Sequence, residues 1–133
     1  MHDMEQSFYE GLYESAEFTK ALGRMVLSSA KFEYSLKEYM DSQGKITVSE
    51  KPPLGRLLKL LVKNHTIDQT SSEQFWFLVH QRNCFVHKLY GNLAEYPKNE
   101  FELNRFINRV NSVSDEMEFF SAILIENTKK ANA

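Results

Sequence analysis

Residues 72–90, SEQFWFLVHQRNCFVHKLY, have the apolar spacing of an amphipathic helix, which indicates a helical fold. Hydrophobic residues recur at every third or fourth position, which places them on one side of a helix. They are Phe75, Leu78, Phe85 and Leu89, with Val79 and Val86 beside them. Arg82 stands in the middle of this stripe. Because an unpaired guanidinium is expensive to bury, Arg82 is expected either to pair with a carboxylate or to face a cleft.

Proline positions leave room for helices on both sides of this segment. The three prolines are Pro52, Pro53 and Pro97, and they separate three proline-free blocks. In the first block, residues 4–42 carry the stripe of a helix with one buried face, which is expected to end near Ser42. The stripe consists of Phe8, Leu12, Ala16, Thr19, Leu22, Val26, Ser29, Phe32, Leu36 and Tyr39. One long helix and two helices with a break both fit, because two glycines weaken the stripe.

Two further helices follow from the hydrophobic spacing. A short one after the proline pair has leucines on one side and Arg56, Lys59 and Lys63 on another. The last helix is predicted from about Asn99 to about Lys129. Its buried stripe has heptad-like spacing and consists of Leu103, Phe106, Val110, Val113, Met117, Phe120 and Leu124.

The remaining local patterns complete an all-helical prediction. The quoted helix is expected to start at an N-cap, Thr70 or Ser71, with Glu73 completing a capping box. Residues 44–53 are interpreted as a connector, since their one β-prone patch has no second strand to pair with. The sequence therefore predicts a single all-α domain over residues 1–133, an antiparallel bundle of four or five helices.

The composition is that of an ordinary globular protein. The chain has 133 residues and a net charge of −2, with 42% hydrophobic and 26% charged residues, enough for one core. Its single cysteine, Cys84, cannot form an intrachain disulfide. Glutamates interrupt the N-terminal residues, and no apolar run approaches the roughly 20 residues that span a membrane. A cytoplasmic protein without a secretory signal is expected.

The middle third is basic although the whole chain is acidic. Residues 51–94 hold six basic side chains and two acidic ones, a local net charge of +4. A solvated basic face and a polyanion site both fit this pattern. For a polyanion such as RNA, the candidate contacts are Arg56, Lys59, Lys63 and Lys88.

Three residues of metal-ligating type also fall on the quoted helix. His80, Cys84 and His87 stand at positions i, i+4 and i+7. A structural zinc site needs a fourth ligand, and there is no second cysteine to supply it. No metal and no cofactor are therefore expected, and Cys84 is interpreted as a small core residue.

Arg82, Asn83 and His87 together suit phosphate chemistry. Arginine is a fixed fork of donors for phosphoryl oxygens, and histidine exchanges a proton near neutral pH. On an ideal helix Arg82 and His87 lie about 140° apart, so they flank one edge. The competing interpretation is a structural ion pair between Arg82 and Glu33, which stands at the edge of the stripe in the first helix.

The segment RNCFVH, residues 82–87, resembles the Arg-Asn-x-x-x-His motif of the HEPN superfamily of all-helical domains. The order of elements is similar too: a long first helix containing Glu33, a leucine-rich helix, the motif helix and a long final helix. The resemblance implies a homodimer in which the two motif helices meet. Both copies of Arg82 and His87 would then line one basic cleft.

Many HEPN proteins are metal-independent endoribonucleases, often toxins of toxin–antitoxin pairs or phage-defence enzymes. In their mechanism the RNA 2′-hydroxyl attacks the adjacent phosphate, leaving a cyclic phosphate and a 5′-hydroxyl. The resemblance implies that His87 assists proton transfer or holds the phosphate, that Arg82 stabilises charge on the phosphoryl oxygens, and that Asn83 orients one of them. RNA, a second copy of the chain and a protein antitoxin or regulatory partner are the implied partners.

One departure from the family pattern and one alternative function accompany this resemblance. Toxins neutralised by a nucleotidyltransferase have a tyrosine two places after the histidine, where this chain has Leu89 and then Tyr90. The chain thus departs from the pattern that accompanies AMP transfer. The alternative function is a non-catalytic regulator or binding module that resembles the mannitol operon repressor family.

The final helix has more hydrophobic residues than its stripe requires. Phe119, Ile123 and Ile125 lie around its circumference. A wide core contact and a subunit interface both fit this excess.

Overall fold

The computed structural model describes residues 9–44, 56, 58–59, 63, 67–91 and 99–132, and of residues 87–91 the backbone alone. Three long helices make up most of this part: α2 (Ala16–Ser42), α4 (Gln69–Gly91) and α5 (Glu100–Asn132). Residues 9–14 form a helical segment before α2. The described residues contain no strand, so the predicted all-α helical bundle is confirmed.

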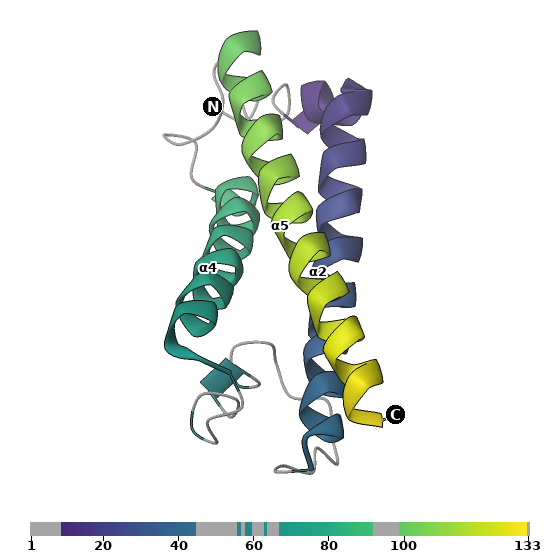
Figure 1. Cartoon of the computed structure of the whole chain (residues 1–133). Coiled ribbons are helices and arrows are strands. Elements are labelled where there is room, and N and C mark those ends of the chain that lie inside the picture. Colours follow the sequence, from purple (N-terminus) through teal and green to yellow (C-terminus); the bar gives the residue numbers. More distant parts are fainter. Residues whose placement is uncertain are drawn as a thin grey trace.

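α4 runs antiparallel to the other two helices, as predicted, whereas α2 and α5 run parallel to each other, so the predicted antiparallel arrangement is wrong for this pair (Figure 1). The ring centroids of Phe18 and Phe106, near the starts of α2 and α5, are 6.0 Å apart. Phe75, early in α4, is 5.1 Å from Phe120 of α5, and Phe85, later in α4, is 5.4 Å from Phe106. The C-terminal half of α4 therefore lies beside the N-terminal half of α5.

A break at Ser15 decides between one helix and two in the first block. Ser15 has an extended backbone (φ −80°, ψ 103°), and its hydroxyl oxygen accepts a 3.2 Å hydrogen bond from the amide of Phe18. It is thus the N-cap of α2, while Gly23 lies inside the helix without interrupting it. α2 ends at Ser42 as predicted, and Gly44 follows with φ +67°, a left-handed conformation that glycine adopts readily.

α4 begins earlier than the sequence pattern predicts. Oδ1 of Asp68 accepts a 2.6 Å hydrogen bond from the amide of Ser71, so the N-cap is Asp68 and the prediction of Thr70 or Ser71 is wrong. An aspartate caps a helix as well as serine does, and its charge is favourable at the positive end of the helix dipole. Glu73 accepts a hydrogen bond from the Gln69 side chain instead of closing a capping box.

The prediction for α5 is close to its observed bounds. Oδ1 of Asn99 accepts a 2.9 Å hydrogen bond from the amide of Glu102 and caps the helix, which continues to Asn132. The predicted stripe is confirmed. Its buried members are Phe106, Val110, Val113, Met117 and Leu124, and its half-buried members are Leu103 and Phe120.

Small residues line the contact between α2 and α5. Ala21, Ser28 and Ser35 recur at seven-residue intervals on α2, as Ser114 and Ser121 do on α5, and all are buried. Small side chains let two helices approach closely. This contact is more extensive than the one between α4 and α5.

Phenylalanine side chains hold α4 against this pair of helices. Phe75 packs edge-on against Phe32 of α2 and Phe120 of α5, with ring centroids 5.0 and 5.1 Å apart. Phe85 packs in the same way on Phe106. Since rings are bulkier than serine, α4 lies farther from its neighbours than they do from each other.

Two of the surplus hydrophobic residues on α5 do not belong to the core. Phe119 is 62% and Ile123 is 42% exposed, so a wide core contact is wrong for both, while Ile125 is half-buried. Within the described part of the chain, no helix combines the length and apolarity needed to span a membrane.

The connector predicted after Gly44 and most of the leucine-rich helix lie outside the described residues. The described positions of that helix are helical, with Leu58 buried and Arg56, Lys59 and Lys63 exposed.

Candidate functional site

Arg82 reaches from α4 to α2. Its neighbours in the stripe, Leu78 and Phe85, are buried, whereas Arg82 is half-buried. Its Nη1 atom donates a 2.8 Å hydrogen bond to Oγ of Ser29, a buried residue of α2. This bond fixes the guanidinium at the contact between the two helices.

Asn83 holds the other side of the same guanidinium. Nε and Nη2 of Arg82 donate hydrogen bonds to Oδ1 of Asn83, at 3.3 and 3.1 Å. One N–H group on each terminal nitrogen is left without an acceptor among the described residues. These two groups are available to the oxygens of a ligand, and paired donors of this kind recognise phosphates and carboxylates.

The predicted ion pair between Arg82 and Glu33 does not form. Within the described residues both ion pairs are made by Arg24. Ser29 and Glu33 lie one helical turn apart on α2, and the guanidinium of Arg82 meets the earlier turn. Glu33 is half-buried on the next turn, so Arg82 has no carboxylate partner among the described residues.

The neutrality of both partners of Arg82 determines what the site can bind. A hydroxyl and an amide accept hydrogen bonds but carry no charge. An anion that approaches Arg82 therefore meets a positive charge that no carboxylate of the described residues neutralises. The site is suited to a phosphate or another oxyanion.

The rest of the predicted motif lies at the end of α4. The backbone places position 87 one turn beyond Asn83. The side chains of His87, Lys88, Leu89 and Tyr90 lie outside the described residues, and the predictions for them are untested.

His80 and Cys84 pair on the solvent side of α4. Cys84 Sγ lies 3.4 Å from His80 Nε2, with His80 exposed and Cys84 half-buried. Cys84 is thus not the fully buried core residue that the sequence suggested. Three or more ligand side chains placed to hold a metal do not occur among the described residues, which do not include the side chain of His87.

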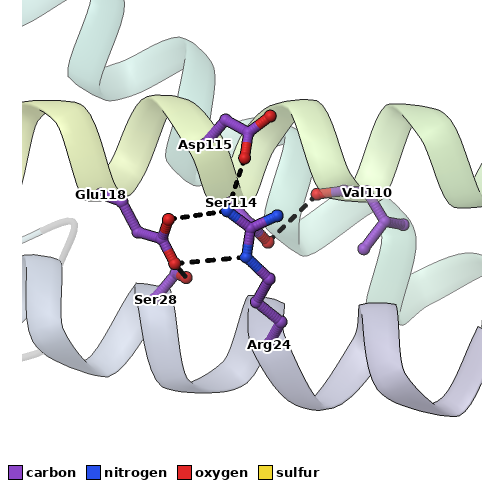
Figure 2. Close-up of polar contacts among 6 residues, drawn as sticks. All are labelled: Arg24, Ser28, Val110, Ser114, Asp115 and Glu118. Atoms are coloured by element: carbon purple, nitrogen blue, oxygen red, sulfur yellow. Dashed lines mark hydrogen bonds and ion pairs between the residues drawn. The ribbon is translucent and has the colours of Figure 1, made fainter.

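A charged cluster between α2 and α5 was not anticipated from the sequence (Figure 2). Arg24 donates from Nε and Nη2 to the two carboxylate oxygens of Glu118, at 3.2 and 2.7 Å, and from Nη2 to Asp115 at 2.5 Å. The hydroxyl of Ser28 donates a 3.1 Å hydrogen bond to Glu118. The cluster thus covers the edge of the small-residue contact, and its two carboxylates more than offset the charge of Arg24.

The electrostatics of this cluster differ from those at Arg82. The hydrogen bonds from Arg24 lower the pKa of Glu118, and the hydroxyl of Ser28 acts in the same direction. Glu118 and Asp115 raise the pKa of Arg24 above its usual range. Arg24 is therefore a structural arginine with two carboxylate partners, and it is a natural control for Arg82.

Two further arginines were missed because the sequence flanking the middle third is acidic overall. Cζ of Arg109 on α5 lies 5.5 Å from the ring centroid of Phe85, and its Nη2 donates a 3.5 Å hydrogen bond to Gln81 of α4. Cζ of Arg105 lies 5.8 Å from the ring centroid of Phe101. The spacing of Phe101 and Arg105, four positions apart on one helix, was a sequence signal that could have identified this pair.

A surface hollow of about 320 Å³ lies between α4 and α5, toward the start of α4. It is lined by Thr70, Glu73, Gln74, Phe77, Leu78, Glu116 and Phe120. Its two carboxylates and the absence of a basic residue in its lining make it unsuited to phosphate. The candidate site at Arg82 is thus separate from this hollow.

Comparisons with protein-family models, with curated proteins and with solved structures give no match to this chain. The HEPN resemblance therefore stays a prediction based on the motif and on the order of the helices.

Proposed function

We propose that this protein is a metal-independent endoribonuclease of the HEPN type, with Arg82, Asn83 and His87 at its centre. The observation that carries the proposal is the neutral environment of Arg82. Its partners Ser29 and Asn83 orient the guanidinium and leave its charge available to a phosphate. A purely structural arginine, such as Arg24, has carboxylate partners instead.

The proposed reaction needs charge stabilisation and proton transfer. The 2′-hydroxyl of RNA attacks the adjacent phosphorus, and the bond from phosphorus to the 5′-oxygen of the next nucleotide breaks. The attacking oxygen loses a proton and the leaving oxygen gains one, which yields a cyclic phosphate and a 5′-hydroxyl. Arg82 stabilises the charge on the nonbridging oxygens, and His87 transfers a proton or holds the phosphate.

The proposal includes a homodimer in which two α4 helices bring both copies of the motif to one cleft. Val86, one turn beyond Arg82 on α4, is 53% exposed and supports such a contact, whereas the exposed Phe77 lies on the opposite side of the helix and lines the hollow toward α5. In this proposal Ser29 orients the guanidinium of Arg82, and Glu33, one turn further along α2, has no part in the reaction. The exposed Arg56, Lys59 and Lys63, together with Lys88, are proposed to contact the RNA backbone.

An enzyme of this kind would act on RNA in the cytoplasm. We infer a role as the toxin of a toxin–antitoxin pair or in phage defence, with a protein antitoxin or regulator as partner. This inference rests on the HEPN resemblance alone.

The test is an RNA cleavage assay with the purified full chain in the presence of a chelator. Wild type is expected to produce fragments with a cyclic phosphate at one new end and a 5′-hydroxyl at the other. Arg82→Ala and His87→Ala are expected to lose this activity, whereas Arg24→Ala retains it. RNA left intact by wild type, or cut equally by wild type and the Arg82 and His87 variants, would rule out the proposal.

The non-catalytic regulator that resembles the mannitol operon repressor family remains the alternative. The hydrogen bond from Arg82 to Ser29 joins two helices, and a structural role of this kind favours the alternative. Under this alternative RNA survives incubation with wild type, and Arg82→Ala affects only the free energy of unfolding.

A further inference from the structure

The N-terminal half of α5 presents an exposed side that combines an aromatic ring with arginines and uncharged polar side chains. Counting about 100° per residue, Phe101, Arg105 and Arg109 lie on one side of the helix. Asn108 and Ser112 share that side and are exposed, as the other three residues are. The glutamates on either side of Phe101 in the sequence project about 100° away from it. Glu102 therefore borders this side about 20° around the helix from Arg109, and the rest of the side has several hydrogen-bond donors as far as Ser112.

Neither arginine on this side has a carboxylate partner among the described residues. The ion pairs within the described residues involve Arg24, and neither Arg105 nor Arg109 takes part in them. Each guanidinium is instead held over a ring, Arg105 over Phe101 at 5.8 Å and Arg109 over Phe85 at 5.5 Å. Stacking on a ring restricts the guanidinium and leaves its charge available.

Phe101 is 69% exposed, although it is one of the largest apolar side chains in the chain. Its contact with Arg105 leaves most of the ring open to solvent. An exposed aromatic ring beside arginines is the arrangement on which unpaired nucleic-acid bases stack.

The geometry of Arg109 connects this side of α5 to the candidate site. Its guanidinium donates to Gln81, the residue that precedes Arg82 on α4. Gln81 faces α5 while Arg82 faces α2, and the exposed His80 and Asn83 lie on the solvent side of α4. A strand that leaves Arg82 across the solvent side of α4 therefore reaches Arg109.

We propose that Phe101, Arg105 and Arg109 form a binding strip for single-stranded RNA, in which the arginines contact two phosphates and an unpaired base stacks on Phe101. The proposal deepens the function proposed above and rests on it for the identity of the polyanion. A duplex is a poorer ligand because its bases are already stacked and paired.

The test is a binding titration of the full chain with a fluorescent oligonucleotide of 2′-O-methyl RNA. This probe lacks the attacking hydroxyl, so binding is measured without cleavage. Fluorescence anisotropy over a range of NaCl concentrations gives the dissociation constant and its salt dependence for single-stranded and duplex forms. Circular dichroism checks that each variant keeps its helices.

Replacing both arginines, Arg105→Gln with Arg109→Gln, is expected to weaken binding of the single strand. The plot of log affinity against log salt should become less steep by about 1.4, since each phosphate contact on a single strand contributes about 0.7. Lys129→Gln with Lys130→Gln changes the net charge equally at the far end of α5 and is expected to leave the slope unchanged. The proposed binding strip would be wrong if the arginine variant had the same salt slope as wild type, or if the lysine control lost as much slope as the arginine variant.

Phe101→Ala is expected to weaken binding of the single strand about tenfold without changing the salt slope, because base stacking involves no counterion release. Binding of the duplex should not change. If Phe101→Ala weakens both forms equally, or neither form, the assignment to single-stranded RNA is wrong.

Failure of the strip and failure of the nuclease are distinguishable. If Arg82→Ala abolishes cleavage while the strip variants bind the probe like wild type, the nuclease stands and the strip is overturned. If neither wild type nor any variant cleaves RNA, but the arginine variant still has a weaker salt dependence of binding than wild type, the binding strip is supported and the nuclease proposal is wrong.

Discussion

Arg82 and Ser29 are joined by a 2.8 Å hydrogen bond across the contact between α4 and α2. The bond positions the guanidinium without neutralising it, because the hydroxyl carries no charge. A carboxylate in its place would hold the arginine equally well and would repel a phosphate. Because Arg82 bonds to Ser29 and not to Glu33 one helical turn away, the arginine is suited to an anion site and not to a structural ion pair.

Replacing Glu33 is expected to have little effect on stability. Since Glu33 makes no ion pair with Arg82, Glu33→Gln should change the free energy of unfolding by less than about 0.5 kcal/mol. A buried ion pair would instead lose about 3–5 kcal/mol when one partner is removed. Urea denaturation of the wild type and the variant distinguishes these values, and a loss in the higher range would restore the ion pair.

Replacing Ser29 tests the positioning of the guanidinium. Ser29→Ala removes a hydrogen bond between a neutral acceptor and a charged donor and should lower the free energy of unfolding by about 1.5 kcal/mol. With Arg82 less well oriented, single-turnover cleavage should slow while RNA affinity is retained, because the charge is still present. Glu33→Gln is the matched control on the next turn. An unchanged cleavage rate in Ser29→Ala would show that this bond does not position Arg82.

The ion pair between Arg24 and Glu118 predicts a pH-dependent contribution to stability. The pKa of Glu118 is lower in the folded chain than in the unfolded chain. Its contribution is therefore fully present above the unfolded pKa, near 4.5, and is lost as the pH falls through the folded pKa. Wild type should exceed Glu118→Gln in urea midpoint at neutral pH, and the two midpoints should converge in acid. A difference that stays constant from neutral to acid pH would contradict this.

The small-residue contact between α2 and α5 contains one serine without a partner. Ser121 is fully buried and its hydroxyl has no hydrogen-bond partner within the described part of the chain, whereas the Ser114 hydroxyl donates to the carbonyl of Val110. Ser121→Ala removes an unsatisfied polar group and should raise the free energy of unfolding by about 1 kcal/mol. Thermal denaturation should rank Ser121→Ala above wild type and above Ser114→Ala. The reverse order would mean that the Ser121 hydroxyl is satisfied.

Hydrophobic spacing in the sequence predicted the buried side of α4, of α5 and of the second half of α2. In the first half of α2 the prediction was wrong, because Ala16, Thr19 and Val26 are exposed while Phe18, Ala21 and Met25 are buried. The stripe of α5 and the end of α2 at Ser42 were both correct, because burial of one helix face follows directly from its period. The start of α4 was wrong because Asp68, Thr70 and Ser71 are all good N-cap residues. Spacing alone does not rank them.

The candidate site required the relative placement of helices, which no single helix encodes. Ser29 and Glu33 lie on the same side of α2, so periodicity cannot tell which of them faces Arg82. That choice depends on how α4 packs on α2 through Phe32 and Phe75. The partners of Arg24 lie on another helix far along the chain, and this ion pair had no local signal for the same reason.

A comparison of two arginines that differ in their partners tests the catalytic role of Arg82 most directly. Single-turnover cleavage of labelled RNA would be measured in chelator for wild type, Arg82→Ala and Arg24→Ala, under conditions in which all three are folded. Arg82→Ala should lower the rate about 100- to 1000-fold, as removal of a donor that stabilises transition-state charge does. Arg24→Ala should cleave at the wild-type rate. Equal rates for Arg82→Ala and wild type, or a loss in Arg24→Ala as large as in Arg82→Ala, would contradict a catalytic role for Arg82.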